Sequence, residues 1–266
     1  MSDKKHLGAP VAVVTGGSRG LGRGIAAALV EDGFRVFATG RSINTAKLPD
    51  RVVRITCDHT CDKDTESAFA RVAEEANRID VLVNAAWGGY ERMSEDGRFT
   101  WSAPFWEQSA HRWTSMMDAG VRAAWICASY AARTMTTQRQ GLIANIGYWA
   151  ARKYLGNTLY GAAKAATDKM TTDMAQELQP YGVAAVSLYP GLVRTEAVMA
   201  AAAGGWLDLK NSESPEFTGR VISALVKNNG LMDRSGHVLI VAELAREFGV
   251  LDIDGQRPTP LTLETA

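Results

Sequence analysis

The sequence has little that would mark a secreted, membrane-spanning or nucleic-acid-binding protein. Its 266 residues include only three cysteines, an odd number and too few for a disulfide framework. Lys and Arg number 29, as do Asp and Glu, so the formal net charge is zero; binding through nucleic-acid phosphates needs clustered excess cations. No apolar run approaches the roughly 20 residues of a membrane-spanning helix, and the polar start Met1–His6 lacks the apolar core of a signal peptide. These absences predict a cytoplasmic protein with no membrane span and no nucleic-acid partner.

Two of the cysteines lie close to a histidine. Cys57, His59 and Cys61 alternate in Cys-Asp-His-Thr-Cys, and alternate residues of a strand share one face. No fourth ligand accompanies them. We therefore interpret the group as one core thiol and two loop residues, and predict no metal site.

Short apolar runs that suit buried strands alternate with helical patterns along most of the chain. The expected strands cover residues 10–15, 34–39, 51–57, 79–84, 141–146, 183–188 and 237–241, and the expected helices cover 21–31, 62–78, 106–138 and 158–179. This alternation predicts a single α/β domain over residues 1–266, with a doubly wound parallel sheet of about seven strands and helices on both faces. Two segments, 87–105 and 195–217, interrupt the alternation after strand ends, at the edge where such sheets bind ligands. We expect them to form the walls of a substrate pocket.

A glycine-rich turn, Thr-Gly-Gly-Ser-Arg-Gly-Leu-Gly over residues 15–22, joins the first expected strand to the first expected helix. Glycine permits close approach of a pyrophosphate, and the helix N-terminus presents free N–H groups and a positive dipole end. In this strand–turn–helix context the turn predicts a Rossmann-type, dinucleotide-binding sheet. The residues expected to bind the cofactor here are Gly16, Ser18, Arg19, Gly20, Leu21 and Gly22.

The end of the second expected strand bears on the choice of cofactor. NAD-binding folds place an acidic residue there, about 20 residues after the turn, to accept hydrogen bonds from the ribose 2′-hydroxyl. This chain reads Thr39-Gly40-Arg41, and Arg19 in the turn offers a second guanidinium with no competing carboxylate. Guanidinium binds phosphate through a bidentate fork. We predict NADP(H) rather than NAD(H); the alternative is that both arginines are solvated surface residues.

Tyr160 and Lys164 stand four residues apart at the start of the helix that follows the fifth expected strand. Side chains at this spacing share one helix face, and an adjacent ammonium lowers the pKa of a phenol from about 10 towards neutrality. We predict that Tyr160 donates a proton to a carbonyl that receives hydride, or accepts one in the reverse reaction.

The Gly-x3-Gly-x-Gly spacing of the turn, together with Tyr160 and Lys164, resembles the short-chain dehydrogenase/reductase family, and the resemblance extends from about residue 11 to about residue 254. It implies a homodimer or homotetramer. It also implies cofactor contacts at both ends of the dinucleotide: adenine at Asp58, adenine ribose at Asn84, the nicotinamide ribose side at Tyr160 and Lys164, and the nicotinamide carboxamide at Pro190, Gly191, Val193 and Thr195.

Three positions depart from the family pattern. Tyr148 stands where a serine is usual, and its oxygen lies roughly 4 Å farther from Cα; it either donates to the substrate oxygen as a third catalytic residue or forms only a pocket wall. Gly120 stands where the long helix usually carries an asparagine, and Trp87 replaces a glycine. We interpret Asn145 as a structural strand residue rather than the missing amide. Gly120-Val121-Arg122, Trp87, the twelve-residue spacing from Tyr148 to Tyr160 and the tail Leu-Ala-Arg-Glu-Phe-Gly over residues 244–249 resemble one branch of the family, which is associated with NADPH-dependent reduction of steroids and other carbonyls. That branch usually keeps a serine where Tyr148 stands.

Aromatic residues are concentrated in or beside the expected pocket segments: Trp87, Tyr90, Trp101, Trp106, Tyr148, Trp149, Tyr154 and Trp206. An aromatic cleft suits a flat or apolar substrate, although aromatic residues also cover subunit interfaces. We predict an NADPH-dependent reductase that acts on the carbonyl or imine of an apolar or aromatic small molecule. The alternatives are an NADP(H)-binding sensor or scaffold with an altered centre, and an isomerase or lyase built on the same fold.

Overall fold

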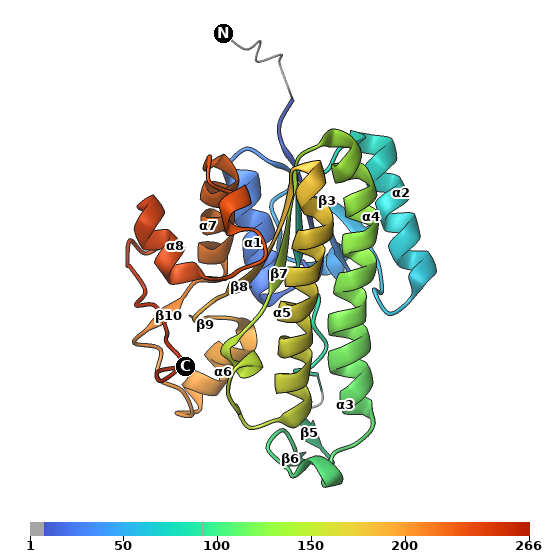
Figure 1. Cartoon of the computed structure of the whole chain (residues 1–266). Helices are drawn as coiled ribbons and strands as arrows, with labels where there is room; N and C mark the ends of the chain where they lie inside the picture. The colour runs from blue at the N-terminus through green and yellow to red at the C-terminus, as the bar shows by residue number, and fades with distance from the viewer. Residues whose placement is uncertain (1–7, 92) are drawn as a thin grey trace.

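The computed structural model describes residues 8–91 and 93–266 (Figure 1). A parallel sheet of seven strands lies at its centre, in the order β11-β8-β7-β4-β1-β2-β3. The strands are β1 (Val11–Val14), β2 (Arg35–Gly40), β3 (Val53–Thr56), β4 (Val81–Asn84), β7 (Gly141–Ile146), β8 (Val183–Tyr189) and β11 (Val238–Ile240). The predicted doubly wound, Rossmann-type sheet is confirmed. The polar segment Met1–His6, from which we inferred the lack of a signal peptide, lies outside the described residues.

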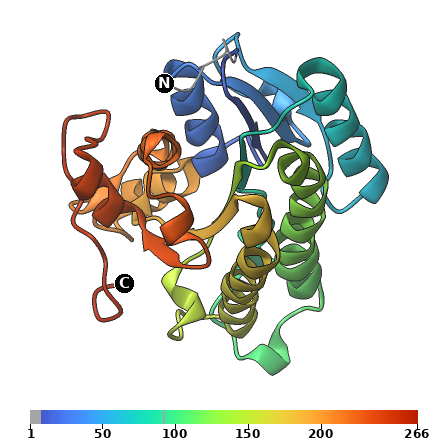
Figure 2. The ribbon, with the colours of Figure 1, turned by 45° about the horizontal axis from the view of Figure 1, so that its top comes forward.

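Helices cover both faces of the sheet (Figure 2). One face packs against α1 (Gly20–Glu31), α7 (Pro215–Lys227) and α8 (Val241–Phe248), and the other against α2 (Asp62–Ala76), α4 (Ala123–Gln138) and α5 (Thr158–Leu178). Along β1, Ala12 and Val14 join the first core while Val11 and Val13 join the second. Successive strand side chains point to opposite faces, so a continuous apolar strand is buried on both sides.

The long helix expected over residues 106–138 begins later than predicted. Residues 105–107 form a separate 3-10 turn, η2 (Phe105–Glu107), after which Gln108 is extended and its Nε2 donates to the carbonyls of Trp101 and Ala103. The helix proper starts with α3 (His111–Trp113) and continues through a π-helical stretch, η3 (Thr114–Arg122), into α4. Gly120 lies within this stretch, and π-helical turns are frequent at functional sites.

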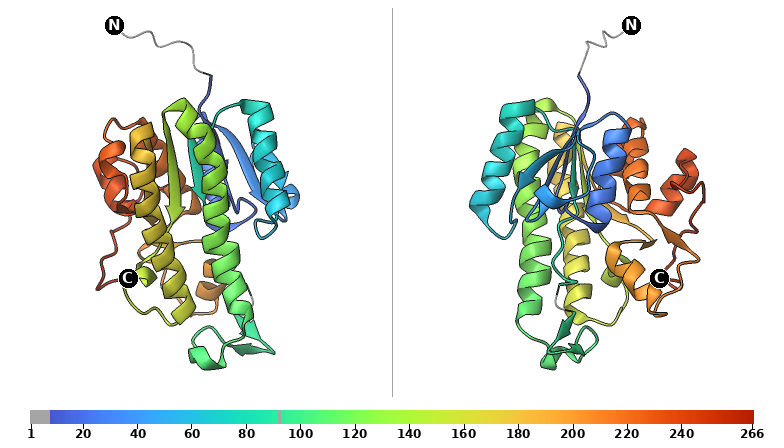
Figure 3. Two further views of the ribbon diagram at one scale, coloured as in Figure 1. Left: turned by 45° about the vertical axis from the view of Figure 1, so that its right-hand side comes forward. Right: turned by 180° about the vertical axis from the view of Figure 1, so that it is seen from behind.

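Both interrupting segments lie beyond the carboxyl ends of the central strands (Figures 1 and 3). The first contains the antiparallel hairpin β5 (Ser94–Glu95) and β6 (Arg98–Phe99). The second contains α6 (Glu196–Ala203) and β10 (Ser212–Glu213), and β10 pairs in parallel with β9 (Leu192–Val193). Shorter 3-10 turns are η1 (Ile43–Thr45), η4 (Trp149–Ala151), η5 (Gln179–Tyr181) and η6 (Met232–Arg234).

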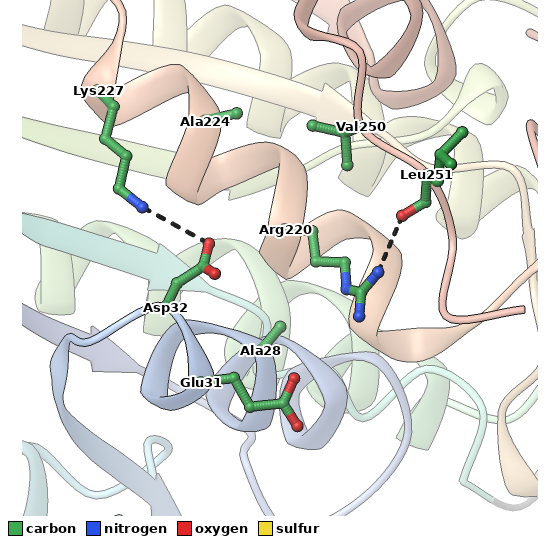
Figure 4. A pocket seen from close by; sticks show the side chains of 8 residues that line it. All are labelled: Ala28, Glu31, Asp32, Arg220, Ala224, Lys227, Val250 and Leu251. Atoms are coloured by element: carbon green, nitrogen blue, oxygen red, sulfur yellow. Dashed lines mark hydrogen bonds and ion pairs between the residues drawn. The ribbon is translucent and has the colours of Figure 1, made fainter. Parts of the chain in front are cut away.

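Within the described part of the chain, every helix is too short or too polar to cross a bilayer. A surface hollow lies between α1, α7 and the C-terminal segment (Figure 4). Three of its charged side chains have partners: Lys227 lies 3.8 Å from Asp32, and Arg220 donates to the carbonyl of Leu251. The groups that carry chemistry lie elsewhere, at the carboxyl edge of the sheet.

Candidate active site

Tyr160 and Lys164 lie buried in the first turns of α5, as their spacing predicts. Asn157 caps this helix, because its Oδ1 accepts a hydrogen bond from the backbone N–H of Tyr160 at 3.0 Å. The Nζ of Lys164 donates to the carbonyl of Ile146, at the end of β7, at 2.8 Å. The cap and this bond fix both side chains relative to the carboxyl edge of the sheet.

The pKa of Tyr160 corrects one expectation. Burial raises this pKa well above its ordinary value, and the neighbouring phenol of Tyr90 adds to the effect. Lys164 does not offset it: its Nζ lies 6.0 Å from the centre of the Tyr160 ring and donates to Ile146, and burial lowers its own pKa to about 8. Tyr160 is therefore a neutral acid in this structure, the form that a proton donor requires.

Four aromatic side chains surround Tyr160. The ring centroids of Trp87, Tyr90, Trp101 and Tyr148 lie 5.8, 6.1, 5.3 and 6.3 Å from that of Tyr160. These four rings pack around Tyr160, and the substrate cleft that they would line stays a prediction. Three of the others do not reach this group of rings, since Trp106, Tyr154 and Trp206 are 71, 72 and 83% exposed; Trp149 packs instead against Tyr189, with centroids 5.4 Å apart.

The hydroxyl that contacts Tyr160 comes from Tyr90, a role the sequence did not suggest. The two phenol oxygens are 3.0 Å apart. Tyr148, considered above as a substitute for the family's serine, contributes its ring, and burial raises its pKa to about 12. The only sequence signal for Tyr90 was its position in the segment after β4.

The glycine turn adopts the conformation that its sequence requires. Gly16 and Gly20 have φ of +68° and +53°, in the left-handed region that favours glycine. A Cβ on Gly16 would lie 2.7 Å from the carbonyl oxygen of Ala85, and one on Gly22 would lie 2.5 Å from that of Gly16. The Ser18 Oγ is buried and has no hydrogen-bond partner among the described residues. Leu21 packs at the border of the core.

The expectation that no carboxylate competes for Arg19 and Arg41 is wrong. The Nη2 atoms of both arginines pair with the same oxygen of Glu91, at 2.9 Å for Arg19. A second carboxylate, Glu196, accepts the backbone N–H of Gly20 at 2.9 Å. Glu91 lies 50 residues from Arg41 along the chain and Glu196 lies 176 from Gly20, so local patterns gave no indication of either contact.

The two residues expected on the adenine side lie in different surroundings. Asp58 is partly exposed after β3, and its Oδ1 accepts hydrogen bonds from the backbone and hydroxyl of Thr60. Asn84 instead turns into the protein, where its Nδ2 donates to the carbonyl of Ala124 and to the Oδ1 of Asn145 at 2.8 Å. Its Oδ1 is buried and has no hydrogen-bond partner among the described residues, so its expected place on the adenine ribose side stays a prediction. Asn145 is fully buried within β7, the structural position expected for it.

The segment from Pro190 to Thr195 lies between the sheet and the glycine turn. The Gly191 N–H donates to the Oε2 of Glu213 at 3.0 Å, and Val193 of β9 pairs with Glu213 of β10. Thr195 caps α6, and its methyl group would lie 3.3 Å from a Cβ on Gly20. The residues expected at the two ends of a dinucleotide thus belong to adjoining segments.

His59 lies in the turn between β3 and α2, as expected, and its side chain is buried against the core. Its Nε2 lies 2.6 Å from the Oγ1 of Thr39, and its Nδ1 lies 3.3 Å from the Sγ of Cys127 and 3.5 Å from that of Cys57. Burial lowers the pKa of His59 to about 4. Cys61 is exposed. Across residues 8–91 and 93–266, no cluster of His, Cys, Asp and Glu is arranged to hold a metal ion.

Comparison with known proteins identifies the family. The sequence pattern of the family described as short chain dehydrogenase matches residues 10–204. Dehydrogenase/reductase SDR family member 1 of Mus musculus is 36% identical over 266 aligned residues, which cover 92% of this chain and 84% of the relative. This relative represents the branch that the sequence resembles, and the resemblance is confirmed.

Solved structures agree with the fold. One described as a short chain dehydrogenase/reductase family protein is 26% identical, with a TM-score of 0.71, and the match covers 89% of this chain and 97% of the other. A second, described as ElxO with NADP bound, is 20% identical with a TM-score of 0.75, covers 88% and 97%, and supports the fold alone. The chain belongs to the short-chain dehydrogenase/reductase family of oxidoreductases.

Proposed function

We propose that the protein is an NADPH-dependent reductase that transfers hydride to the carbonyl or imine carbon of an apolar or aromatic small molecule. The observation that carries the proposal is the buried pair Tyr160 and Lys164 on one face of α5, enclosed by aromatic rings at the carboxyl edge of the sheet. The substrate would lie against these rings, with its oxygen or nitrogen beside the Tyr160 hydroxyl.

The polar groups around the glycine turn fit a phosphorylated dinucleotide. Two guanidiniums converge on one carboxylate oxygen of Glu91, so this position already suits a small anion. The Gly20 N–H likewise binds a carboxylate at the start of α1, where a pyrophosphate would be favoured. Ser18 adds a buried hydroxyl without a partner among the described residues. Binding of NADPH would displace Glu91 from the subsite for its 2′-phosphate and Glu196 from the subsite for its pyrophosphate.

The chain's own residues account for the proton transfer. The reduced nicotinamide, when bound, supplies the hydride. Tyr160 is neutral because burial raises its pKa, so it donates its hydroxyl proton to the substrate oxygen as hydride reaches the carbon. The products are an alcohol and a tyrosinate, whose charge the Lys164 ammonium stabilises from the next turn of the helix. The surrounding rings exclude water from this exchange.

A second function has one structural argument in its favour. Tyr90 hydrogen-bonds to Tyr160, and Glu91 pairs with both arginines, so neighbouring residues of one loop engage both halves of the site. A protein that binds NADP(H) without turnover, or that uses the fold for isomerisation or elimination, would be compatible with this arrangement.

Nicotinamide absorbance under single-turnover conditions tests the proposal. NADPH is mixed with excess protein and a panel of ketones, aldehydes and imines, and Tyr160→Phe serves as the control. Oxidation of NADPH that depends on substrate and is lost in Tyr160→Phe supports the reductase. Tight NADPH binding with no oxidation across the panel favours the second function.

We also propose that the protein acts in the cytoplasm as a homodimer or homotetramer. The support is the resemblance to the family, in which such assemblies are usual. Light scattering of the purified protein measures the subunit count, and a monomer at micromolar concentration would contradict the proposal.

A further inference from the structure

Two of the departures from the family pattern are complementary in shape. A Cβ on Gly120 would lie 2.6 Å from Cζ3 and 2.7 Å from Cε3 of the Trp87 indole. No side chain at position 120 can coexist with the indole in this place. The pattern that the sequence resembles has asparagine at 120 and glycine at 87. This chain has the reverse arrangement of side-chain size: no side chain on the helix at 120 and a large one at 87, in the loop after β4.

The Trp87 indole contacts both reactive side chains. The Nζ of Lys164 lies 4.4 Å from the centre of the indole, within the range of about 6 Å for a cation–π interaction. The Tyr160 ring meets the indole edge to face, at 5.8 Å and 60°. The indole Nε1 is buried and has no hydrogen-bond partner among the described residues. These contacts place a cation-binding ring face and an unpaired N–H donor next to Tyr160 and Lys164.

We propose that Trp87, whose indole fills the space that a side chain at position 120 would take, is a positioning residue: its ring face holds the Lys164 ammonium beside Tyr160. The proposal rests on the reductase function proposed above. A ring face attracts the ammonium but not the neutral amine, so Trp87 favours the charged form of Lys164 that stabilises the tyrosinate. This attraction opposes burial, which lowers the pKa of Lys164 to about 8.

Other ionisable groups also lie around Lys164. Asp168 lies one turn further along α5 and raises the pKa of Lys164. The phenol of Tyr160 lies beside Lys164, and those of Tyr90, Tyr148 and Tyr189 act on Tyr160; burial raises the pKa values of all four. These phenols are neutral at physiological pH, and Asp168 is present in every variant at position 87, so a difference in the Lys164 pKa between these variants reports the change at Trp87.

A double-mutant cycle tests the shape argument without any assay of activity. Gly120→Asn should lower the thermal midpoint strongly, because the new side chain meets the indole, and Trp87→Gly should lower it by leaving a cavity. Trp87→Gly combined with Gly120→Asn restores the family's pair. The thermal midpoint of this double variant should fall by less than the sum of the two single decreases. Additive effects would overturn the complementarity.

A titration tests the positioning role. The pKa of Lys164 is followed through its 13Cε resonance, assigned by comparison with Lys164→Arg. Trp87→Leu should lower this pKa by about one pH unit, while Trp87→Phe, which keeps a ring face, should retain most of it. Trp106→Leu is the matched control, since Trp106 is exposed and absent from the rings around Tyr160.

The kinetic counterpart is the alkaline limb of the pH profile of kcat, which should move to lower pH in Trp87→Leu and return in Trp87→Phe. An unchanged Lys164 pKa in Trp87→Leu would overturn the proposal, whatever the activity. If Tyr160→Phe turned over like the wild type, the reductase function would fail, and the resonance titration would still decide the role of Trp87.

Discussion

Replacing Glu213 by glutamine should remove a loss of stability that sets in as the pH rises. Glu213 is 1% exposed, and burial raises its pKa from 4.5 to about 7. The unfolded chain releases this proton near pH 4.5 and the folded protein releases it near pH 7, so between these values the folded state binds more protons. The free energy of unfolding therefore falls across this window. At about 1.4 kcal/mol per pH unit the loss is about 3 kcal/mol.

Glutamine suits the test because its amide oxygen can still accept the Gly191 N–H while the side chain carries no charge. Urea denaturation from about pH 5 to about pH 8 gives the free energy of unfolding of each protein. The wild type should lose about 3 kcal/mol relative to Glu213→Gln across this range, and the two should agree at the acidic end. Glu243→Gln, on an exposed position of α8, is the control. Parallel curves for wild type and Glu213→Gln would refute the reasoning.

Three further predictions concern the site. Glu91→Gln should tighten NADPH binding several-fold and NADH binding less, because the two arginines lose a competing anion. Fluorescence titration measures both affinities, and equal changes in the two would argue against a 2′-phosphate subsite. Tyr90→Phe removes the hydroxyl bonded to Tyr160 and should slow reduction by about fivefold to tenfold, measured as kcat with saturating NADPH; an unchanged kcat would dismiss this contact. Asp168→Asn should lower the pKa of Lys164 below about 8, because a negative charge that favours the ammonium is removed. The alkaline limb of the pH–rate profile should then move to lower pH. A move to higher pH would contradict the assignment of this limb to Lys164.

The sheet was predictable because each strand is encoded by its own short apolar run. The same holds for Tyr160 and Lys164, since a separation of four residues fixes a shared helix face wherever the helix lies. The late start of the long helix was missed, because the extended backbone at Gln108 depends on a carbonyl contact with Trp101.

Contacts between segments that are far apart in the chain could not be predicted from the sequence. The pairing of Glu91 with the two arginines, the bond from Gly20 to Glu196 and the inward turn of Asn84 each join parts of the chain that only the folded sheet brings together. The raised pKa of Tyr160 is of the same kind, because it comes from burial by rings of three separate loops. Sequence patterns report local geometry, and these features depend on tertiary packing.

Transfer of deuterium from NADPH labelled at the nicotinamide C4 tests the reductase mechanism most directly. In a single turnover with a carbonyl compound that the protein reduces, mass spectrometry should find deuterium on the carbinol carbon. The same experiment with Tyr160→Phe should run about a hundredfold slower or more. An unlabelled product, or a Tyr160→Phe variant that transfers deuterium at the wild-type rate, would contradict the mechanism.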